Sequence, residues 1–384
     1  MSGRAVLLSI ALTSAAAAQQ SAPDGLAPLP AQSLRAPLAD EFDLDREQRE
    51  AAFAAAERGL VWLAGEQGPH GEFQGDVGNK RMDSYIVVRS AEQNRARGEG
   101  HVGLSAIAGM AFLAGGHLPD RGRYGKTVRG VIDYLVEHTG EAGYITDGGT
   151  NMYSHAFATL FLAEAHGMVV DAKLRDALDR AVRMIVDCQN RQGGWRYTPF
   201  TQEADMSVTV CQLQALRAAR NIGIQVNKQT IDDAVGYVMH ARIKRGPDAG
   251  LYYYKTAGAG AWEKSREYAI NAAAVTALAS AGILDESLHA PTLDWLEREY
   301  VDVADYYATH YYYWYGNYYA CQAFFQAGGP RFHSFERRLQ RDLLRTQQSD
   351  GRWRNDVGPG DVFSTAVAAL ILQIEKQYLP IFQR

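Results

Sequence analysis

Cysteine is scarce in this sequence, and its spacing excludes two common roles. The 384 residues contain three cysteines, Cys188, Cys211 and Cys321, and no C-x-x-C pair. An odd number of widely spaced cysteines supports neither a disulfide framework nor a zinc knuckle. Each cysteine lies in a helical pattern, in which a buried thiol packs as a small hydrophobe. We therefore expect free, buried cysteines, and we expect no metal ion or other cofactor.

The sequence also lacks an excess of positive charge and a long apolar run. Lysine and arginine number 39 against 44 aspartates and glutamates, which gives a formal net charge of −5. This balance provides no electrostatic footprint for nucleic acid. No stretch reaches the roughly 18 uninterrupted apolar residues that a membrane-spanning helix needs. We expect neither a nucleic-acid partner nor a transmembrane span.

The first residues are typical of a secretory signal peptide. Arg4 precedes an apolar run over residues 5–12, and small residues fill positions 15–18. A charged start, a short apolar segment and a small-residue cleavage site form the layout of such a peptide. We expect cleavage near Ala18 and export to the periplasm. Residues 19–47, rich in Pro, Ala and Asp, are predicted as an irregular linker, and residues 48–384 as a single domain.

From residue 48 onward, a helix–turn–helix pattern recurs about every fifty residues. Its fullest copy spans residues 181–224, where apolar positions at helical spacing stop at Gly193 and resume after Asp205. Repetition at such a period indicates a repeat architecture. The six predicted pairs are 53–63 with 103–115, 131–138 with 153–167, 181–190 with 206–223, 231–242 with 268–282, 292–300 with 313–328, and 335–346 with 361–374.

The two helices of each pair differ in composition. The second helices are rich in Ala, Ser and Gly, as in residues 269–282, whereas the first helices carry more Arg, Asp and Glu. A helix that is apolar all round is buried, and an amphipathic helix faces solvent on one side. The sequence therefore predicts an all-α fold, an α/α toroid (α6/α6 barrel) of about six helical hairpins. The ends of its inner helices should converge on a cavity.

Three of the predicted turns share the motif Gln-x3-Gly-x-aromatic. It resembles the QW motif of the squalene cyclase and protein prenyltransferase β-subunit repeat superfamily, and the resemblance covers nearly the whole mature chain. The resemblance implies that the Gln side chain caps a neighbouring helix while the aromatic ring stacks in the turn. The copies are Gln67-x3-Gly71-x-Phe73, Gln189-x3-Gly193-x-Trp195 and Gln347-x3-Gly351-x-Trp353.

The acid motif of the cyclases is present only in part. In these enzymes the middle residue of Asp-x-Asp-Asp protonates a polyene, and the similar stretch here begins at Glu203. Asp205 matches the acid, Glu203 keeps only the charge, and Met206 replaces an aspartate. The resemblance makes Asp205 a candidate acid with Glu203 beside it. The alternative is that Asp205 is a helix N-cap.

Two further motifs of related toroids are incomplete. Prenyltransferases hold zinc with an Asp-x-Cys pair and a distant His, whereas here Tyr319 and Ser364 stand at two of those places and only Cys321 remains. One ligand of three does not hold zinc, so a zinc prenyltransferase is not expected. Residues 63–67 are similar to the thioester motif of complement proteins, but Ala64 replaces its cysteine, which excludes that bond.

Aromatic and polar residues gather where the inner helices are predicted to begin. Aromatic rings can stabilise carbocations or stack on sugars. The alternative for each tyrosine is packing between helices, and the alternative for the histidine is a core position. The candidate set is His155, as a catalytic residue, and Tyr153, Tyr268, Asn271, Tyr313, Trp314, Tyr315 and Asn317, as ligand-binding residues.

The signal peptide predicts an exported protein, and the resemblance implies that it binds an isoprenoid or another apolar ligand in the central cavity. It leaves open whether the protein is an enzyme; an enzyme of this kind would be a terpene cyclase- or mutase-like isomerase. One alternative is a non-catalytic periplasmic scaffold. Another is a glycan-active toroid enzyme such as a polysaccharide lyase, because Tyr, His and Asn can carry out base–acid β-elimination.

Overall fold

The computed structural model describes residues 42–81, 84–300 and 312–383. The expected signal peptide and most of the expected linker lie outside these residues. Residues 43–384 form one compact unit. Its first helix, α1 (Phe42–Glu66), begins ahead of residue 48.

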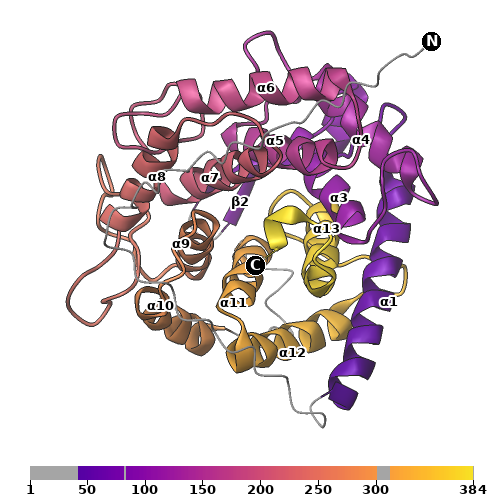
Figure 1. Cartoon of the computed structure of the whole chain (residues 1–384). Helices are drawn as coiled ribbons and strands as arrows, with labels where there is room; N and C mark the ends of the chain where they lie inside the picture. Colours follow the sequence, from indigo (N-terminus) through magenta and orange to yellow (C-terminus); the bar gives the residue numbers. More distant parts are fainter. Residues whose placement is uncertain (1–41, 82–83, 301–311, 384) are drawn as a thin grey trace, which may run out of the picture. The chain divides into compact units, whose positions relative to one another are not determined.

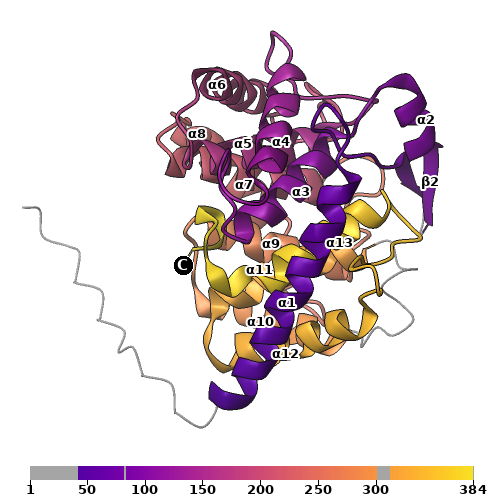
Figure 2. The same cartoon turned by 90° about the vertical axis from the view of Figure 1, so that its right-hand side faces the viewer.

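The unit is an α/α toroid of six helical hairpins (Figures 1 and 2), as the sequence predicts. Six helices form the outer ring and six form the inner ring. The outer helices are α1, α4 (Gly125–Glu137), α6 (Ala172–Asp187), α8 (Lys228–His240), α10 (Glu286–Glu299) and α12 (Gly329–Thr346). The inner helices are α3 (Val102–Ala114), α5 (Met152–His166), α7 (Met206–Asn221), α9 (Tyr268–Ser280), α11 (Tyr313–Ala327) and α13 (Asp361–Leu372).

The composition of each ring explains its position. Every residue of α3 is buried, which suits a helix that contacts the neighbouring inner helices α5 and α13 and its outer partner α4. On α6, the buried residues recur at helical spacing, from Leu174 through Leu178 to Ile185, and the opposite face is polar. Each inner helix contacts the next, and α13 contacts α3, so the ring closes. The cysteines are buried and free, as expected.

The glutamine of the turn motif joins adjacent hairpins. Gln189 donates from Nε2 to the carbonyl of Gly193 in its own turn (2.8 Å) and to the carbonyl of Thr230 in α8 (2.9 Å). Trp195 donates from Nε1 to the carbonyl of Ile185 at 2.7 Å. Gly193 has φ +85°, and a Cβ there would lie 2.3 Å from the backbone oxygen of Asp233. The motif therefore holds the turn against the next outer helix. Gln189 does so by donating to a carbonyl within the first turn of α8, whose N-cap is Asn227, and so does not act as the predicted helix cap.

The last copy of the motif closes the ring. Gln347 donates to Gly351 and to the carbonyl of Ala55 in α1, both at 2.8 Å. The first copy behaves alike, since Gln67 donates to the carbonyl of Thr127 in α4 at 2.9 Å. We call the contact between α1 and the α12–α13 hairpin the closing seam.

The sequence analysis did not anticipate an insertion between α1 and α3. Strands β1 (Val77–Arg81) and β2 (Ser84–Arg89) pair antiparallel, and the short helix α2 (Ala91–Arg97) follows. Asp76 anchors the insertion, because its Oδ1 accepts a hydrogen bond from Ala91 N–H (2.7 Å) and its N–H donates to the carbonyl of Pro359 (3.1 Å). The insertion is thereby held beside the start of α13.

The remaining elements follow α13. They are the 3-10 helices η2 (Ile374–Lys376) and η3 (Pro380–Phe382). None of the helices in the described part of the chain is both long and apolar enough to cross a membrane.

Candidate functional site

An open cavity of about 360 Å³ lies where the inner helices begin. Each of the six inner helices contributes at least one residue to its wall, which matches the predicted position of a cavity. The β1–β2 insertion adds a further wall. The contributing inner-helix residues include Leu104, Tyr153, Ser207, Ile270, Tyr315 and Phe363, and the insertion contributes Val77, Gly78, Tyr85 and Val88.

The described lining is aromatic and polar but carries no carboxylate, lysine or arginine. Its polar groups are hydroxyls, one imidazole and one amide, and its apolar part is built from residues such as Leu104, Ile107 and Phe157. Six tyrosines belong to the lining: Tyr85, Tyr153, Tyr197, Tyr254, Tyr312 and Tyr315.

His101 is the imidazole of the cavity and also the N-cap of α3. Its Nδ1 accepts a hydrogen bond from Leu104 N–H at 3.2 Å. Burial lowers the pKa of His101 to about 4, so the ring is neutral near pH 7. Since Nδ1 is an acceptor, the proton of the neutral ring is assigned to Nε2. His101 therefore offers an N–H donor.

A chain of hydroxyl groups leads from the cavity to a buried carboxylate. The Tyr153 hydroxyl donates to Ser207 Oγ, and the Ser207 hydroxyl donates to Asp205 Oδ1 at 2.7 Å. Tyr153 and Ser207 line the cavity, whereas Asp205 lies behind them and is fully buried. Burial, and next the charge of Asp205, raise the pKa of Tyr153 well above its ordinary value. We call these three side chains the relay.

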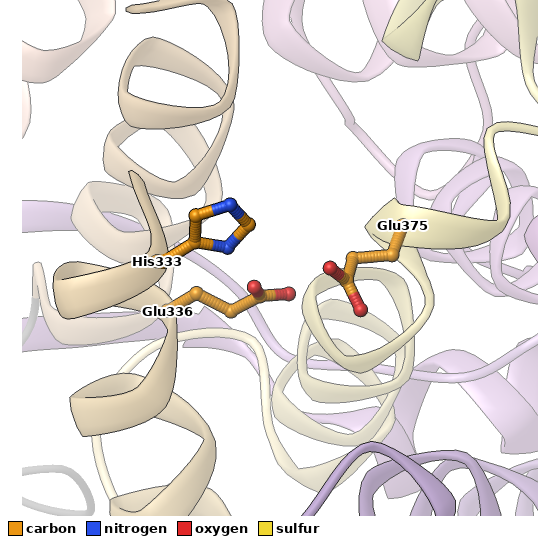
Figure 3. A group of neighbouring side chains, drawn as sticks. All are labelled: His333, Glu336 and Glu375. Atoms are coloured by element: carbon orange, nitrogen blue, oxygen red, sulfur yellow. The ribbon is translucent and has the colours of Figure 1, made fainter. Parts of the chain in front are cut away.

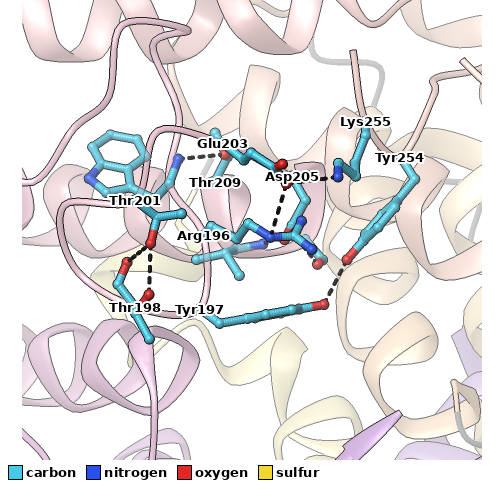
Figure 4. Close-up of polar contacts among 12 residues, drawn as sticks. Arg196, Tyr197, Thr198, Thr201, Glu203, Asp205, Thr209, Tyr254 and Lys255 are labelled. Atoms are coloured by element: carbon cyan, nitrogen blue, oxygen red, sulfur yellow. Dashed lines mark hydrogen bonds and ion pairs between the residues drawn. The ribbon is translucent and has the colours of Figure 1, made fainter. Parts of the chain in front are cut away.

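Charged groups surround the inner end of the relay (Figure 4). Arg196 Nη1 lies 3.2 Å from Asp205 Oδ2. Beside this pair, Lys255 Nζ donates to Glu203 Oε2 at 3.0 Å. Burial raises the pKa of Asp205, although hydrogen bonds from Ser207 and the Val208 N–H and the charge of Arg196 act in the opposite direction. The Tyr197 and Tyr254 hydroxyls lie 2.8 Å apart and join the loop that precedes α7 to the loop that precedes α9.

The structure separates the predicted catalytic residues. Asp205 is the N-cap of α7 and accepts from Val208 N–H at 2.9 Å, so the N-cap alternative is confirmed. Glu203 pairs with Lys255 and does not line the cavity. His155 is fully buried, and its Nδ1 accepts from the Ile145 N–H at 3.1 Å. Burial lowers the pKa of His155 to about 3, as expected for a core histidine.

Two of the predicted ligand-binding residues, Tyr153 and Tyr315, line the cavity. The other five, Tyr268, Asn271, Tyr313, Trp314 and Asn317, are absent from the described lining. Tyr268 donates to Asn317 Oδ1 at 3.1 Å, so these two side chains join α9 to α11. Asn271 accepts from Tyr252 N–H at 2.9 Å and donates to the carbonyl of Ser265 at 2.7 Å, which fixes a turn.

Sequence reasoning missed His101, Ser207 and Tyr85 as site residues. A histidine and a serine at inner-helix starts were available signals, since His101 precedes α3 and Ser207 opens α7. Tyr85 belongs to the unanticipated insertion. The β-branched run at residues 86–88 was its signal.

The chain resembles solved structures of glycan-active proteins in fold. No protein-family model matches it, and no curated protein matches its sequence. An α-1,6-mannanase of glycoside hydrolase family 76 from Salegentibacter sp., in complex with α-1,6-mannotriose, has TM-score 0.61 and 9% identity over 85% of this chain and 99% of that chain. Cellobiose 2-epimerase from Spirochaeta thermophila has TM-score 0.64 and 14% identity over 88% and 98%. A family 76 mannosidase from Bacteroides thetaiotaomicron has TM-score 0.58 and 10% identity over 85% and 99%.

These neighbours correct the family interpretation. The toroid matches mannanases and an epimerase, so the assignment to the squalene cyclase and prenyltransferase superfamily is wrong, as is the terpenoid or isoprenoid role derived from it. The physical reason lies in the turn motif. Its Gln and Trp donate hydrogen bonds to backbone carbonyls, and its Gly leaves room for the next outer helix. These are packing contacts between hairpins. The motif therefore specifies packing rather than chemistry.

Proposed function

We propose that the protein is a glycan-active enzyme that binds a saccharide in the cavity and transfers protons to and from it. The observation that carries this proposal is the relay from Tyr153 through Ser207 to Asp205, which opens into a tyrosine-lined cavity. The names of the proteins with similar folds describe enzymes that act on saccharides, and one of these structures contains bound mannotriose.

The lining suits an uncharged saccharide. Tyrosine rings offer faces on which a sugar ring can stack, and their hydroxyls exchange hydrogen bonds with sugar hydroxyls. The described lining has no fixed charge that a neutral ligand would leave unpaired. A volume of about 360 Å³ falls in the usual range for small-molecule sites, roughly 300–1,000 Å³.

The relay supplies a base. When Tyr153 oxygen takes a proton from the substrate, its own proton passes to Ser207 and the Ser207 proton passes to Asp205. The transfer converts the Asp205 carboxylate into a neutral carboxylic acid. Because Asp205 is buried, its surroundings favour this neutral form. His101 lines the same cavity. Its Nε2–H can donate a hydrogen bond to the substrate oxygen at which negative charge develops.

Hydrolysis by two carboxylates is less well supported. Most glycoside hydrolases place two carboxyl groups across the scissile bond, and the mannanase is inactive when two consecutive aspartates are replaced. No carboxylate belongs to the described lining of this cavity. The consecutive pair Asp232–Asp233 lies on the outer helix α8, where the two side chains contact Lys228 and Gln229. Proton abstraction, as in epimerisation or β-elimination, fits better.

Solvent deuterium incorporation tests this proposal. Neutral di- and oligosaccharides are incubated with the protein in D₂O and followed by NMR. We expect an epimer that carries deuterium at the carbon from which the proton is removed, or an unsaturated sugar that has lost the hydrogen from that carbon, and no saturated hydrolysis product. Tyr153→Phe, which removes the hydroxyl at the head of the relay, should abolish the exchange. Simple hydrolysis without exchange, or unchanged exchange in Tyr153→Phe, contradicts the proposal.

A further inference from the structure

Three metal-ligating side chains meet at the closing seam, outside the cavity. His333 and Glu336 belong to α12, and Glu375 belongs to η2 (Figure 3). One ligand atom from each residue lies within 4.8 Å of the other two. One imidazole and two carboxylates form a donor set that divalent transition metals accept.

The backbone already presents these donors together. His333 and Glu336 are three residues apart and therefore share one face of α12. Ligands bound to zinc at about 2.0–2.2 Å lie roughly 3–4 Å from one another. Closing from at most 4.8 Å to that spacing requires small side-chain rotations. His333 is exposed and can make them.

Groups from outside the set orient both carboxylates. Gln340 donates from Nε2 to Glu336 Oε1 at 3.1 Å, and Gln48 of α1 in turn donates to Gln340 Oε1 at 3.2 Å. Arg49 of α1 pairs through Nε with Glu375 Oε2 at 2.8 Å. Each carboxylate is thus held by a neighbouring side chain, as carboxylates that ligate metals commonly are.

Burial makes the set unlike an ordinary surface cluster. Glu336 is only 6% exposed, and a hollow of about 10 Å³ lies among Gln48, Arg49, His333, Glu336 and Glu375, with Arg337 and Gln340 completing its wall. That volume accommodates about one water-sized particle. Two neighbouring carboxylates, one of them buried, repel each other unless positive charge compensates them. Arg49 pairs with Glu375, and Arg337 belongs to the wall of the same hollow.

We propose that His333, Glu336 and Glu375 bind one divalent transition-metal ion of the zinc class. The imidazole favours such an ion over Mg²⁺ and Ca²⁺, which prefer sites made of oxygen alone. The ion joins α12 to η2 and holds the end of the chain against α1. Its role is structural and does not depend on the saccharide chemistry of the cavity.

Metal titration of the full chain tests this site. The protein, purified without an affinity tag and dialysed against a chelator, is titrated with Zn²⁺ by calorimetry and with Co²⁺ by visible absorbance. We expect one ion per chain, retained in excess Mg²⁺. His333→Ala and Glu336→Gln should each weaken binding by about tenfold or more. At equal concentration, Zn²⁺ should raise the Tm of the wild type more than the Tm of His333→Ala.

His70→Ala is the matched control, because His70 is also an exposed histidine and lies outside the set. It should bind Zn²⁺ like the wild type. Two results overturn the proposal: a wild type that binds less than one ion per chain, or a His333→Ala variant that binds Zn²⁺ with wild-type affinity and stoichiometry.

Discussion

Asp205 combines two roles at the residue scale. As the N-cap of α7 it satisfies the Val208 N–H, and as the end of the relay it accepts from Ser207. Asp205 also forms an ion pair with Arg196, and the Asp205 side chain in this pair is 0% exposed. The N-cap role and the proposed proton-accepting role therefore share one carboxyl group, and substitutions can separate them.

Asp205→Asn should remove catalysis and retain the fold. Asn is an equally good N-cap and keeps an oxygen for Val208 and Ser207, but it cannot take up the relay proton. Turnover should fall about 100-fold or more. The free energy of unfolding should fall by about 1–3 kcal/mol, because Arg196 loses its ion pair with Asp205 and keeps only the longer one to Glu203, at 3.7 Å. Steady-state kinetics and chemical denaturation measure the two effects.

Asp171→Asn is the matched control for this change. Asp171 is likewise an N-cap that pairs with an arginine, since it caps α6 and lies 2.7 Å from Arg129. It belongs to the outer ring, away from the described cavity lining. The control should lose stability and keep its turnover. Equal losses of turnover in the two variants would refute a proton-accepting role for Asp205.

Glu164 should make the free energy of unfolding depend on pH. It is 1% exposed, and burial raises its pKa to about 8 in the folded protein. Between about pH 4.5 and 8, the unfolded chain holds Glu164 ionised while the folded chain holds it protonated. The folded state then binds more protons, so this residue makes stability fall as pH rises through that window.

Glu164→Gln should remove this dependence. The amide keeps an oxygen for the Ile381 N–H, which Glu164 Oε1 accepts at 3.2 Å, and it never ionises. The variant should therefore gain Tm relative to the wild type at pH 8 and gain little at pH 5. Differential scanning calorimetry at the two pH values gives both differences. An equal difference at pH 5 and pH 8 would contradict a raised pKa.

The turn glycines decide packing at the element scale. Gly193 and Gly223 have nearly the same backbone conformation, with φ +85° and +84°. A Cβ at Gly193 would clash with the α8 backbone at Asp233, whereas a Cβ at Gly223 would meet open space. An alanine would therefore strain the backbone at both positions. Of these two positions, only Gly193 lies close to the backbone of a neighbouring helix.

Gly193→Ala should therefore cost more than Gly223→Ala. The strain of a left-handed alanine costs about 1–2 kcal/mol at either position. At Gly193 the displacement of α8 adds about 1–3 kcal/mol. Urea denaturation of the two variants measures the difference in free energy of unfolding. Equal losses would mean that the turn motif does not hold α8 in place.

The helices were predictable from the sequence because each carries its own signal. The Ala-rich inner helices and the turn motifs located all six hairpins. The insertion was missed, although residues 86–88 are β-branched, because a two-stranded hairpin interrupts the first helical pair. Chemistry was harder to predict than packing, since the Gln and Trp of the turn motif make packing contacts and do not belong to the described cavity lining.

The site was predictable only in part because helix rotation decides which side chains face the cavity. Tyr153 and Tyr268 both lie at the start of an inner helix, yet only Tyr153 lines the cavity. Tyr268 instead lies against Gly316 of α11, where a Cβ would come within 2.9 Å of its ring. A small residue on the neighbouring helix thus makes room for the Tyr268 ring, and that contact is not visible in one chain segment.

At the scale of the whole molecule, the toroid separates stability from chemistry. Turn motifs and the closing seam lie among the outer helices, and the cavity lies at the starts of the inner ones. The outer contacts join each hairpin to the next, so the cavity wall can vary while the ring stays closed. This separation explains how a toroid resembling mannanases can carry a cavity whose described lining has no carboxylate.

A crystal structure of Tyr153→Phe with a neutral oligosaccharide tests the central claim most directly. The variant retains the ring that lines the cavity and lacks the hydroxyl that begins the relay, so substrate should remain bound and unchanged. The account predicts a sugar ring in the cavity, stacked on tyrosine and within hydrogen-bond distance of Ser207 and His101 Nε2. A saccharide bound elsewhere on the molecule, with the cavity free of sugar, would contradict it.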